Sequence, residues 1–438
     1  KKNRWGYFPA VSAGWVISQE DFMGWSRPAM DYLKIRGSWG KNGSVAPLSN
    51  YSYSTNIARH LDPKGYNAQE MRYSWNTQFG SQFPTLPDNP FTGQYQYTMT
   101  YMPSTMGNDG LGWEKMAQWD LGFDARFFNS RLTFTFDYYQ KKTEGLLLYG
   151  VIPSLSLGGT TSPMNAGTVK NSGFEFDLGW QDRIGDFSYS VNANLSTLHN
   201  KVEKLHPSVP RIDGVGYSGQ TLTLFEEGEK VWHFYGYKYL GVNQETGEAM
   251  FDDMVDGIPG LTPEDKTNIG DAIPDVTYGI TVNLAYKGFD FTFFGSGTAG
   301  NDVFMAIQRP DKGTSNRMKE VFYDGRWVAG VNSPSNPAKL PSATTDYTTY
   351  LYSSGMVFSG DFFKIRQLQL GYTIPKNLTR KIFVENFRAY VSLDDFFTFS
   401  SYPGMDPEVA ANYGSGQGID FGTYPTSKKV VLGFNITF

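Results

Sequence analysis

The sequence predicts an all-β fold: a transmembrane antiparallel β-barrel, of which this chain forms the C-terminal portion, about eleven strands with long extracellular loops. Three observations predict this fold. Apolar and polar residues alternate in many stretches, aromatic residues make up 16% of the 438 residues, and the connections between the alternating stretches are short and long in turn. Successive side chains of a strand point to opposite faces, so a strand with one apolar face suits lipid outside and a wet lumen inside.

The alternation is clearest at the end of the chain, from Lys428 to Phe438. One face of this predicted strand is mostly small or polar. The other face carries Val430, Leu432, Phe434, Ile436 and Phe438. A soluble sheet over a core and a membrane barrel can both use such a strand. The rest of the sequence favours the membrane.

The same alternation recurs along the chain, for example from Leu132 to Tyr138 and from Phe187 to Leu195. A period of two residues is typical of strands and not of helices. The predicted strands lie near 5–18, 31–42, 113–127, 131–142, 171–180, 187–197, 276–286, 288–298, 362–374, 387–399 and 428–438.

The connections between these strands alternate in length, as they do in outer-membrane barrels with short periplasmic turns and long extracellular loops. Long connections without structure of their own are uncommon in compact soluble domains. The short connections lie at 24–30, 128–130, 181–186, 287 and 375–386. The long connections lie at 43–112, 143–170, 198–275, 299–361 and 400–427.

Composition restricts the other classes of protein. No run of about 18 apolar residues occurs, which excludes a transmembrane helix, and a mean hydropathy of −0.40 fits strands with one polar face. The net charge of −5, without a run of Lys or Arg, argues against nucleic acid as a partner. The chain has no cysteine, so disulfides and thiolate metal sites are excluded.

The predicted number of strands is odd, whereas bacterial single-chain barrels have even numbers. An open sheet would also leave unpaired N–H and C=O groups at two edges in lipid. We therefore expect further strands to precede Lys1.

Several stretches carry a family resemblance. They read NAGTVKNSGFEFD (Asn165–Asp177), DFFKIRQLQLGYTIP (Asp361–Pro375), FFTFSSYPGMDPEV (Phe396–Val409) and GTYPTSKKVVLGFNITF (Gly422–Phe438), with further matches in Trp5–Ser18, Leu33–Gly43 and Phe234–Gly241. In this order, and over the full chain, they resemble the SusC/RagA family of TonB-dependent outer-membrane transporters.

The resemblance implies a function and partners. Residues 1–438 would be the C-terminal part of the transporter barrel, with the plug, the TonB box and the early strands upstream. It implies import of a nutrient oligomer, an oligosaccharide or a peptide, across the outer membrane of a Bacteroidetes-like Gram-negative bacterium. It also implies a SusD-like surface lipoprotein as lid and TonB as the source of energy. The alternatives are a passive or structural outer-membrane barrel and a secreted β-sandwich carbohydrate-binding protein.

An acidic loop, Phe251–Asp271, lies where many relatives carry a run that resembles a Ca²⁺ loop. Its carboxylates are hard oxygen ligands that suit Ca²⁺ or Mg²⁺. The candidate ligands are Asp252, Asp253, Asp256 and Asp265. The spacing departs from the D-x-[DN]-x-[DN]-G pattern, so a solvated acidic loop without metal is the favoured alternative.

Aromatic residues in the long connections are candidates for contact with a substrate or partner, because exposed rings stack on sugars or anchor a bound protein. The alternative is that they pack the loops against one another. The candidates are Tyr73, Trp75, Tyr95, Tyr97, Trp232, Tyr235, Trp327, Tyr350 and Tyr352.

Inward-facing polar residues are expected to line a hydrated interior, where they contact substrate or hydrogen-bond the plug. They include Glu175, Asp177, Asn192, Asn194, Asn283, Gln367 and Gln369.

Catalysis finds little support in the sequence. His60, His199, His206 and His233 lie in predicted long connections, without an H-E-x-x-H or G-x-S-x-G motif. Asp394 and the acidic residue that follows it would point to opposite faces of a strand. We therefore expect no enzyme.

Overall fold

The structure is a computed structural model. It describes residues 5–26, 29–46, 48, 56–60, 100–105, 107–108, 110–148, 163–217, 219–253, 257–307, 320–342, 347–409 and 414–438. In this part of the chain, no helix is both long and apolar enough to cross a membrane.

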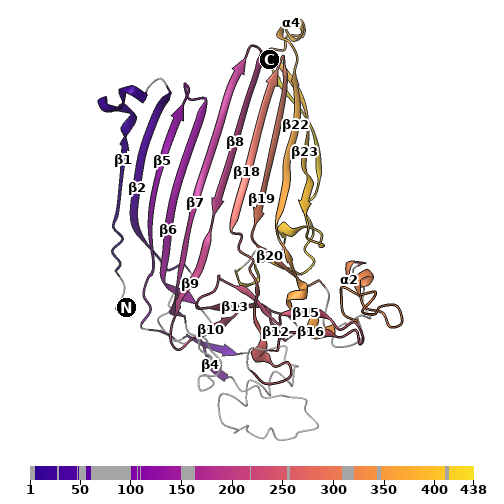
Figure 1. Ribbon diagram of the computed structural model, residues 1–438. Coiled ribbons are helices and arrows are strands. Elements are labelled where there is room, and N and C mark those ends of the chain that lie inside the picture. Colours follow the sequence, from indigo (N-terminus) through magenta and orange to yellow (C-terminus); the bar gives the residue numbers. More distant parts are fainter. Residues whose placement is uncertain are drawn as a thin grey trace, which may run out of the picture.

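One large antiparallel sheet, which we call the wall sheet, forms the body of the described chain (Figure 1). Its strands are β1 (Ala10–Val16), β2 (Met30–Ser44), β5 (Glu114–Phe127), β6 (Leu132–Leu148), β7 (Met164–Ile184), β8 (Phe187–Thr197), β9 (His199–Leu205), β18 (Val276–Tyr286), β19 (Phe289–Ala299), β22 (Phe362–Thr373), β23 (Asn386–Ser400) and β25 (Lys429–Thr437). The order is β1-β2-β5-β6-β7-β8-β18-β19-β22-β23-β25, and β9 pairs with the first part of β7.

All eleven predicted strands are present in this path. The main difference lies at 143–170, where the connection is shorter than expected because β6 and β7 continue their pairing to Leu148 and Met164. The early part of β7 has β9 as its second partner, from Gly167 to Ser172. Pairing on both sides satisfies the backbone groups of this extension.

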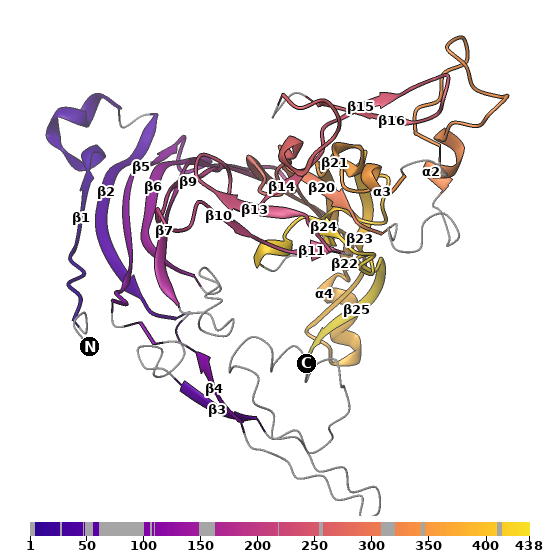
Figure 2. The same cartoon turned by 90° about the horizontal axis from the view of Figure 1, so that it is seen from below.

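The wall sheet curves strongly. Figure 2 shows it as an open arc with β1 near one end and β25 near the other. The short connections gather near the C-terminus at one end of the strands, and the long connections gather at the opposite end (Figure 1). At the short end, β18 and β19 are joined by Lys287 (φ 45°) and Gly288 (φ 90°), the left-handed pair that a tight two-residue hairpin requires.

The outward face of the wall sheet is apolar and exposed. On β25, Phe434 is 67% exposed and Leu432 is 73% exposed. The same face continues across the register pairs Phe136–Phe176 and Phe176–Leu195. Exposed apolar surface of this extent suits lipid and not water. A β-sandwich would cover this face with a second sheet, and the described residues contain no sheet in that position, so the sandwich alternative does not fit the fold.

Aromatic rings cluster on the outward face near the short end. Phe289 and Tyr372 lie 4.5 Å apart between ring centroids, Phe187 and Tyr189 lie 5.6 Å apart, and Phe128 contacts Trp180 at 6.4 Å. Rings at this height form the interfacial girdle that membrane barrels carry.

The long connections fold into a second body, which we call the loop layer, below the strands in Figure 1. Its elements are β3 (Asn56–His60), β4 (Thr100–Thr105), β10 (Arg211–Asp213), β11 (Gly216–Tyr217), β12 (Gln220–Thr221), β13 (Thr223–Glu226), β14 (His233–Gly236), β15 (Tyr239–Val242), β16 (Ala249–Phe251), β17 (Thr267–Gly270), β20 (Asp302–Met305), α2 (Glu320–Gly325), α3 (Tyr347–Tyr350), β21 (Val357–Ser359) and β24 (Ile419–Asp420). Helix α4 (Lys376–Thr379) lies at the short end instead.

The largest hydrophobic core of the described chain lies in this loop layer. Three long connections contribute to it: Phe234 from the 198–275 connection, Phe304 and Met356 from 299–361, and Ile419 from 400–427, all fully buried. Parallel pairing of β20 with β24 joins two of these connections directly. The described parts of these three long connections therefore form a packed body at one end of the wall sheet.

Candidate functional site

The inward face of the wall sheet carries the charged and hydrogen-bonding groups. Arg36 on β2 donates to both carboxylate oxygens of Asp137 on β6, at 2.5 and 2.6 Å. Its other contacts are Asp124 at 3.2 Å and Asp120 at 3.5 Å, both on β5. One guanidinium therefore faces three carboxylates, and this sector of the interior is acidic.

A glycine between the two strands leaves room for the ion pair of Arg36 with Asp137. Gly122 on β5 lies between Arg36 and Asp137 in the register of the three strands. A Cβ at Gly122 would overlap with Asp137 Oδ1 and would lie 2.6 Å from the backbone oxygen of Phe136. No other residue type leaves that room without a shift of the backbone.

The predicted inward-facing polar residues line the same face. Asn192 donates to Asp177 Oδ1 at 3.0 Å, and Asn283 donates to Ser190 Oγ at 3.3 Å. Gln367 and Gln369 contact each other at 3.4 Å. These bonds run between inward side chains of the wall sheet, as the alternation requires.

A partly buried ion cluster ties the segment 401–409 to the wall sheet. Lys364 on β22 is 1% exposed, and its Nζ donates to Asp406 Oδ2 at 2.9 Å and to Glu408 Oε2 at 2.7 Å. Arg366 donates to Glu408 Oε2 at 2.8 Å and contacts Asp395 at 3.4 Å. We call these five residues the Lys364 cluster.

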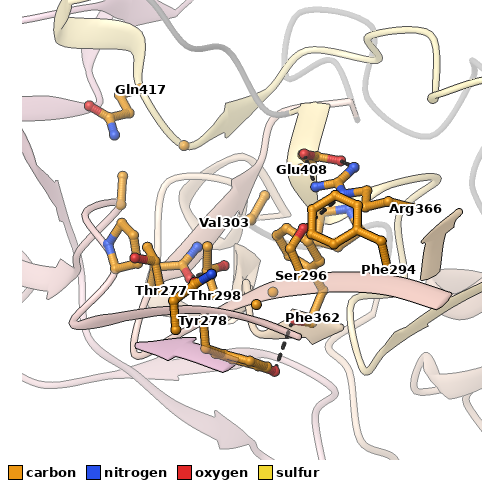
Figure 3. Close-up of a pocket in the computed structure, with 18 residues that line it drawn as sticks. Thr277, Tyr278, Phe294, Ser296, Thr298, Val303, Phe362, Arg366, Glu408 and Gln417 are labelled. Carbon is orange, nitrogen blue, oxygen red and sulfur yellow. Dashed lines mark hydrogen bonds and ion pairs between the residues drawn. The ribbon is translucent and has the colours of Figure 1, made fainter. Parts of the chain in front are cut away.

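A bulge places Arg366 in this cluster. The pairing of β22 with β19 and with β23 shifts register at Arg366, and Asp395 opposite it has a left-handed φ of 53°. An extra residue in one strand re-aims a side chain. Here it turns Arg366 toward Glu408 and Ser296, as Figure 3 shows.

The charges of the cluster shift the pKa of its loop carboxyls. Burial alone raises the pKa of Asp406, but hydrogen bonds from Lys364 and from the Glu408 backbone N–H outweigh burial and hold that pKa below its usual range. Burial likewise opposes ionisation of Glu408, and hydrogen bonds from Arg366 and Lys364 lower its pKa. Both carboxylates are therefore ionised at neutral pH.

A cavity of about 430 Å³ lies beside the Lys364 cluster, at the loop end of β18, β19 and β22 (Figure 3). Wall residues on one side include Thr277, Phe294 and Ser296, and loop residues on the other include Asn301 and Gln417. A pocket of this volume lies within the range of small-molecule sites, about 300–1,000 Å³. It is the candidate binding site of the described chain.

Two of the sequence motifs contain residues of the Lys364 cluster, but neither motif predicts the cavity. Lys364 and Arg366 belong to the stretch Asp361–Pro375, and Asp406 and Glu408 belong to Phe396–Val409. The structure brings these two stretches together through the ion pairs. Sequence reasoning missed the pairing because alternation places residues on a face and says nothing about which loop folds back over it.

Asn165, in the motif that opens β7, anchors the loop ends of three strands. Its side chain donates to the backbone oxygens of Gly145 at 2.7 Å and Gly112 at 3.1 Å, and accepts from the Gly112 N–H at 2.8 Å. This motif residue is therefore structural.

The loop aromatics are mostly internal. Tyr350 is 1% exposed and Tyr352 is 5% exposed, and their hydroxyls donate to the backbone oxygens of Gly355 and Tyr217. For these two residues the structure contradicts the expectation of exposed rings, because they fill the core of the loop layer.

The other described loop aromatics are half-buried. Trp232 packs on Phe225 at 5.3 Å, and Trp327 Nε1 donates to the Gln244 backbone oxygen at 3.0 Å. Tyr235 lies under the guanidinium of Arg211, 5.6 Å from ring centroid to Cζ. Tyr73, Trp75, Tyr95 and Tyr97 lie outside the described residues.

The acidic loop does not form a metal site in the part that the structure describes. Asp252 pairs with Lys238 at 3.2 Å, and Asp253 accepts the Gly260 N–H at 2.8 Å. Asp265 is buried and accepts from the N–H of Thr262 at 2.8 Å. Among the described residues, no group of three or more His, Asp or Glu side chains is placed to hold a metal ion. Asp256 lies outside them.

Comparison with known proteins matches this architecture to one family. The family described as "TonB dependent receptor-like, beta-barrel" matches residues 1–392. The chain belongs to this family. The receptor-barrel assignment agrees with the curved antiparallel sheet, its exposed apolar outer face and its charged inner face.

Relatives of this receptor barrel are longer than the chain. TonB-dependent receptor P3 of Formosa agariphila is 28% identical over 470 residues, covering 100% of this chain and 42% of the relative. TonB-dependent receptor SusC of Bacteroides thetaiotaomicron is 26% identical over 455 residues, with 100% and 40% covered. The chain thus spans less than half the length of these curated relatives.

A solved structure shares the fold. The chain matches a structure of the RagAB peptide transporter with a TM-score of 0.78 and 21% identity, covering 100% of this chain and 44% of that one. The resemblance to SusC and RagA expected from the motifs is confirmed by these matches.

Proposed function

We propose that residues 1–438 form the C-terminal part of the wall of an outer-membrane TonB-dependent transporter that imports a nutrient oligomer, a glycan or a peptide. The supporting observation is the wall sheet itself. Its exposed outer face is apolar, and its inner face carries Arg36, Asp137, Arg388 and Asp290 as ion pairs. A curved sheet with these two faces separates lipid from a wet passage.

The proposal includes further strands and a plug outside this chain. β1 and β25 are the edge strands of the wall sheet among the described residues. An edge in lipid leaves N–H and C=O groups unsatisfied, at several kcal/mol each, so closure by additional strands is favoured. Energy would reach the transporter from TonB through a plug supplied by that remainder of the protein.

A SusD-like surface lipoprotein is the proposed partner of the loop layer. Its exposed apolar residues are candidates for the contact, since Leu240 and Met250 on the β15–β16 hairpin are 56% and 42% exposed and Val331 is 62% exposed. A few well-packed residues that become buried carry most of the binding energy in protein interfaces. Tyr350 and Tyr352 are buried inside the loop layer, so they are not candidates for contact with a partner.

The test is uptake by cells that carry the full-length protein. Labelled pools of glycans and of peptides are supplied to wild-type cells, to cells without this protein and to cells without TonB. We expect uptake of one pool to be lost in both deletions, and the intact protein to co-purify with a lipoprotein. Uptake that persists without TonB would favour the passive barrel instead.

A further inference from the structure

The cavity beside the Lys364 cluster lies between two bodies of the protein. Thr277, Ser296 and Thr298 belong to the loop ends of β18 and β19, while Asn301 and Gln417 belong to the loop layer. Figure 3 shows Gln417 across the cavity from Thr277 and Thr298. A ligand here would touch the wall sheet and the loop layer at once.

The charged residues of the lining are already neutralised. Arg366 and Glu408 pair with each other, and Glu408 also accepts from Lys364 while Arg366 donates to Ser296 Oγ at 2.9 Å. The remaining described lining residues are uncharged. Every charged side chain of the lining already has an ion-pair partner, so a charged ligand group would stay unpaired. Burial of an unpaired charge costs free energy.

The cavity instead offers neutral hydrogen-bonding groups. Within the described chain, the side chains of Asn194, Thr277 and Gln417 line it without a hydrogen-bond partner. Asn301 accepts from Thr298 at 3.1 Å and keeps its amide donors for another partner. Amide and hydroxyl groups supply both donors and acceptors.

Three aromatic residues, Tyr278, Phe294 and Phe362, also belong to the lining, and the argument turns on Phe294. Phe294 pairs with Gln367 and Thr281, so the alternation of β19 places it on the inward face among polar neighbours. It is 37% exposed. An exposed ring on a wet inner face offers an apolar surface to a ligand that also has an apolar face.

We propose that this cavity is a subsite for an uncharged, hydroxyl-rich ring, one sugar unit of a neutral oligosaccharide. Phe294 contacts the apolar face of the ring, and Asn194, Thr277, Asn301 and Gln417 hydrogen-bond its hydroxyls. The inference rests on the proposed import function and narrows its substrate to neutral glycans. Phe294 and the four polar residues are then specificity-determining residues.

The test uses the full-length protein, purified from the outer membrane with any partner that accompanies it. The probes are the neutral hexasaccharides maltohexaose, xylohexaose and mannohexaose, the acidic hexagalacturonate, and a pool of hexapeptides. Binding is measured by titration calorimetry for the native protein and for Phe294→Ala and Asn194→Ala. Two controls are matched: Phe293→Ala removes the neighbouring ring on the outward face of β19, and Ser190→Ala removes an inward hydroxyl outside the cavity.

We expect at least one neutral hexasaccharide to bind, and Phe294→Ala to weaken it by about tenfold through loss of buried apolar contact. Asn194→Ala should weaken it as well, and both controls should bind like the native protein. The inference is overturned if the acidic glycan or the peptides bind best, if no neutral hexasaccharide binds, or if the cavity variants bind like the controls. TonB-dependent uptake of peptides would overturn this inference alone, whereas TonB-independent uptake would overturn the proposed function.

Discussion

Lys364 is a buried cation on the inward face of the wall sheet. Its Nζ contacts Asp406, Glu408 and Thr426, so every donor has an acceptor. A buried ion pair adds little net stability over a well-packed apolar pair, but removal of one partner leaves a buried charge unpaired. Lys364 therefore determines the position of the segment 401–409 more than it adds to the stability of the fold.

We expect Lys364→Met to destabilise the folded protein by about 3–5 kcal/mol, because Asp406 loses its cation in a buried site. The measurement is urea unfolding of the full-length protein in lipid vesicles. Lys376→Met is the control, since the pair of Lys376 with Glu385 is long, at 4.0 Å, and largely exposed. Equal unfolding midpoints for the two variants would contradict the role given to Lys364.

A substitution at Phe434 tests the assignment of the outward, lipid-facing side of the wall sheet. An Arg in place of a lipid-facing residue near the bilayer midplane costs about 2–4 kcal/mol. Phe434→Arg should fold poorly into vesicles, and Asn435→Arg, whose side chain faces inward beside Arg388, should fold nearly as well as the native protein. Similar folding yields for both variants would reverse the assignment of faces.

At the scale of elements, the segment that carries Asp406 and Glu408 should release from the wall sheet in acid. Hydrogen bonds from Lys364 lower the pKa of Asp406, and hydrogen bonds from Arg366 and Lys364 lower the pKa of Glu408. Both pKa values therefore lie below the ordinary carboxyl value of about 4, although burial opposes this. A depressed pKa stabilises the folded state fully above the unfolded value, and this contribution disappears as the pH falls through the folded value.

The melting temperatures of the native protein and of Lys364→Met should therefore differ most near neutral pH. The gap should shrink as the pH falls below about 4, because protonated carboxyls no longer need the cation. Differential scanning calorimetry in detergent between pH 3 and 7 measures the gap. A gap that stays constant over this range would show that the carboxyls do not titrate with the cluster.

The alternation of short and long connections gives an orientation test. The chain has no cysteine of its own, so single cysteines can be introduced and labelled selectively. In intact cells a membrane-impermeant maleimide should label Glu264→Cys in the loop layer, and Asp186→Cys in the β7–β8 turn should react only after lysis. Labelling of Asp186→Cys alone would invert the orientation.

At the scale of the whole molecule, the open edges of the wall sheet should prevent this segment from forming a barrel by itself. Residues 1–438 expressed alone with a secretion signal should show no heat-dependent shift in gel migration. The full-length protein should show that shift, because a closed barrel resists detergent until it is heated. A shift in the segment alone would show that β1 and β25 can close against each other.

The sequence predicted the wall sheet well because alternation is a local property. The alternation from Leu132 to Tyr138, or from Lys429 to Thr437, defines the two faces of a strand from its own residues, whichever strand pairs with it. Parity then placed Asn192, Asn283 and Gln367 on the inward face, where the structure has them.

The loop layer could not be predicted in the same way. Its strands are only two to six residues long, for example Ile419–Asp420 and His233–Gly236, too short to show a period. Their core joins Phe234 to Phe304 and Ile419 across long separations in the chain, and no local pattern encodes those contacts. The ion pair of Lys364 with Asp406 and the cavity beside it depend on the same long-range folding.

The length of β7 sets how far the loop layer stands from the membrane. Its 21 residues span roughly 70 Å at about 3.3 Å per residue, or roughly 50 Å along the bilayer normal at a tilt of about 40°. The apolar band of such proteins is only about 25 Å tall. The part of β7 next to the long connections pairs with β6 and with β9. The length of β7 beyond the apolar band therefore forms a rigid extension of the wall sheet on that side. A large molecule can therefore approach the loop layer from the flank as well as from above, clear of the lipid headgroups.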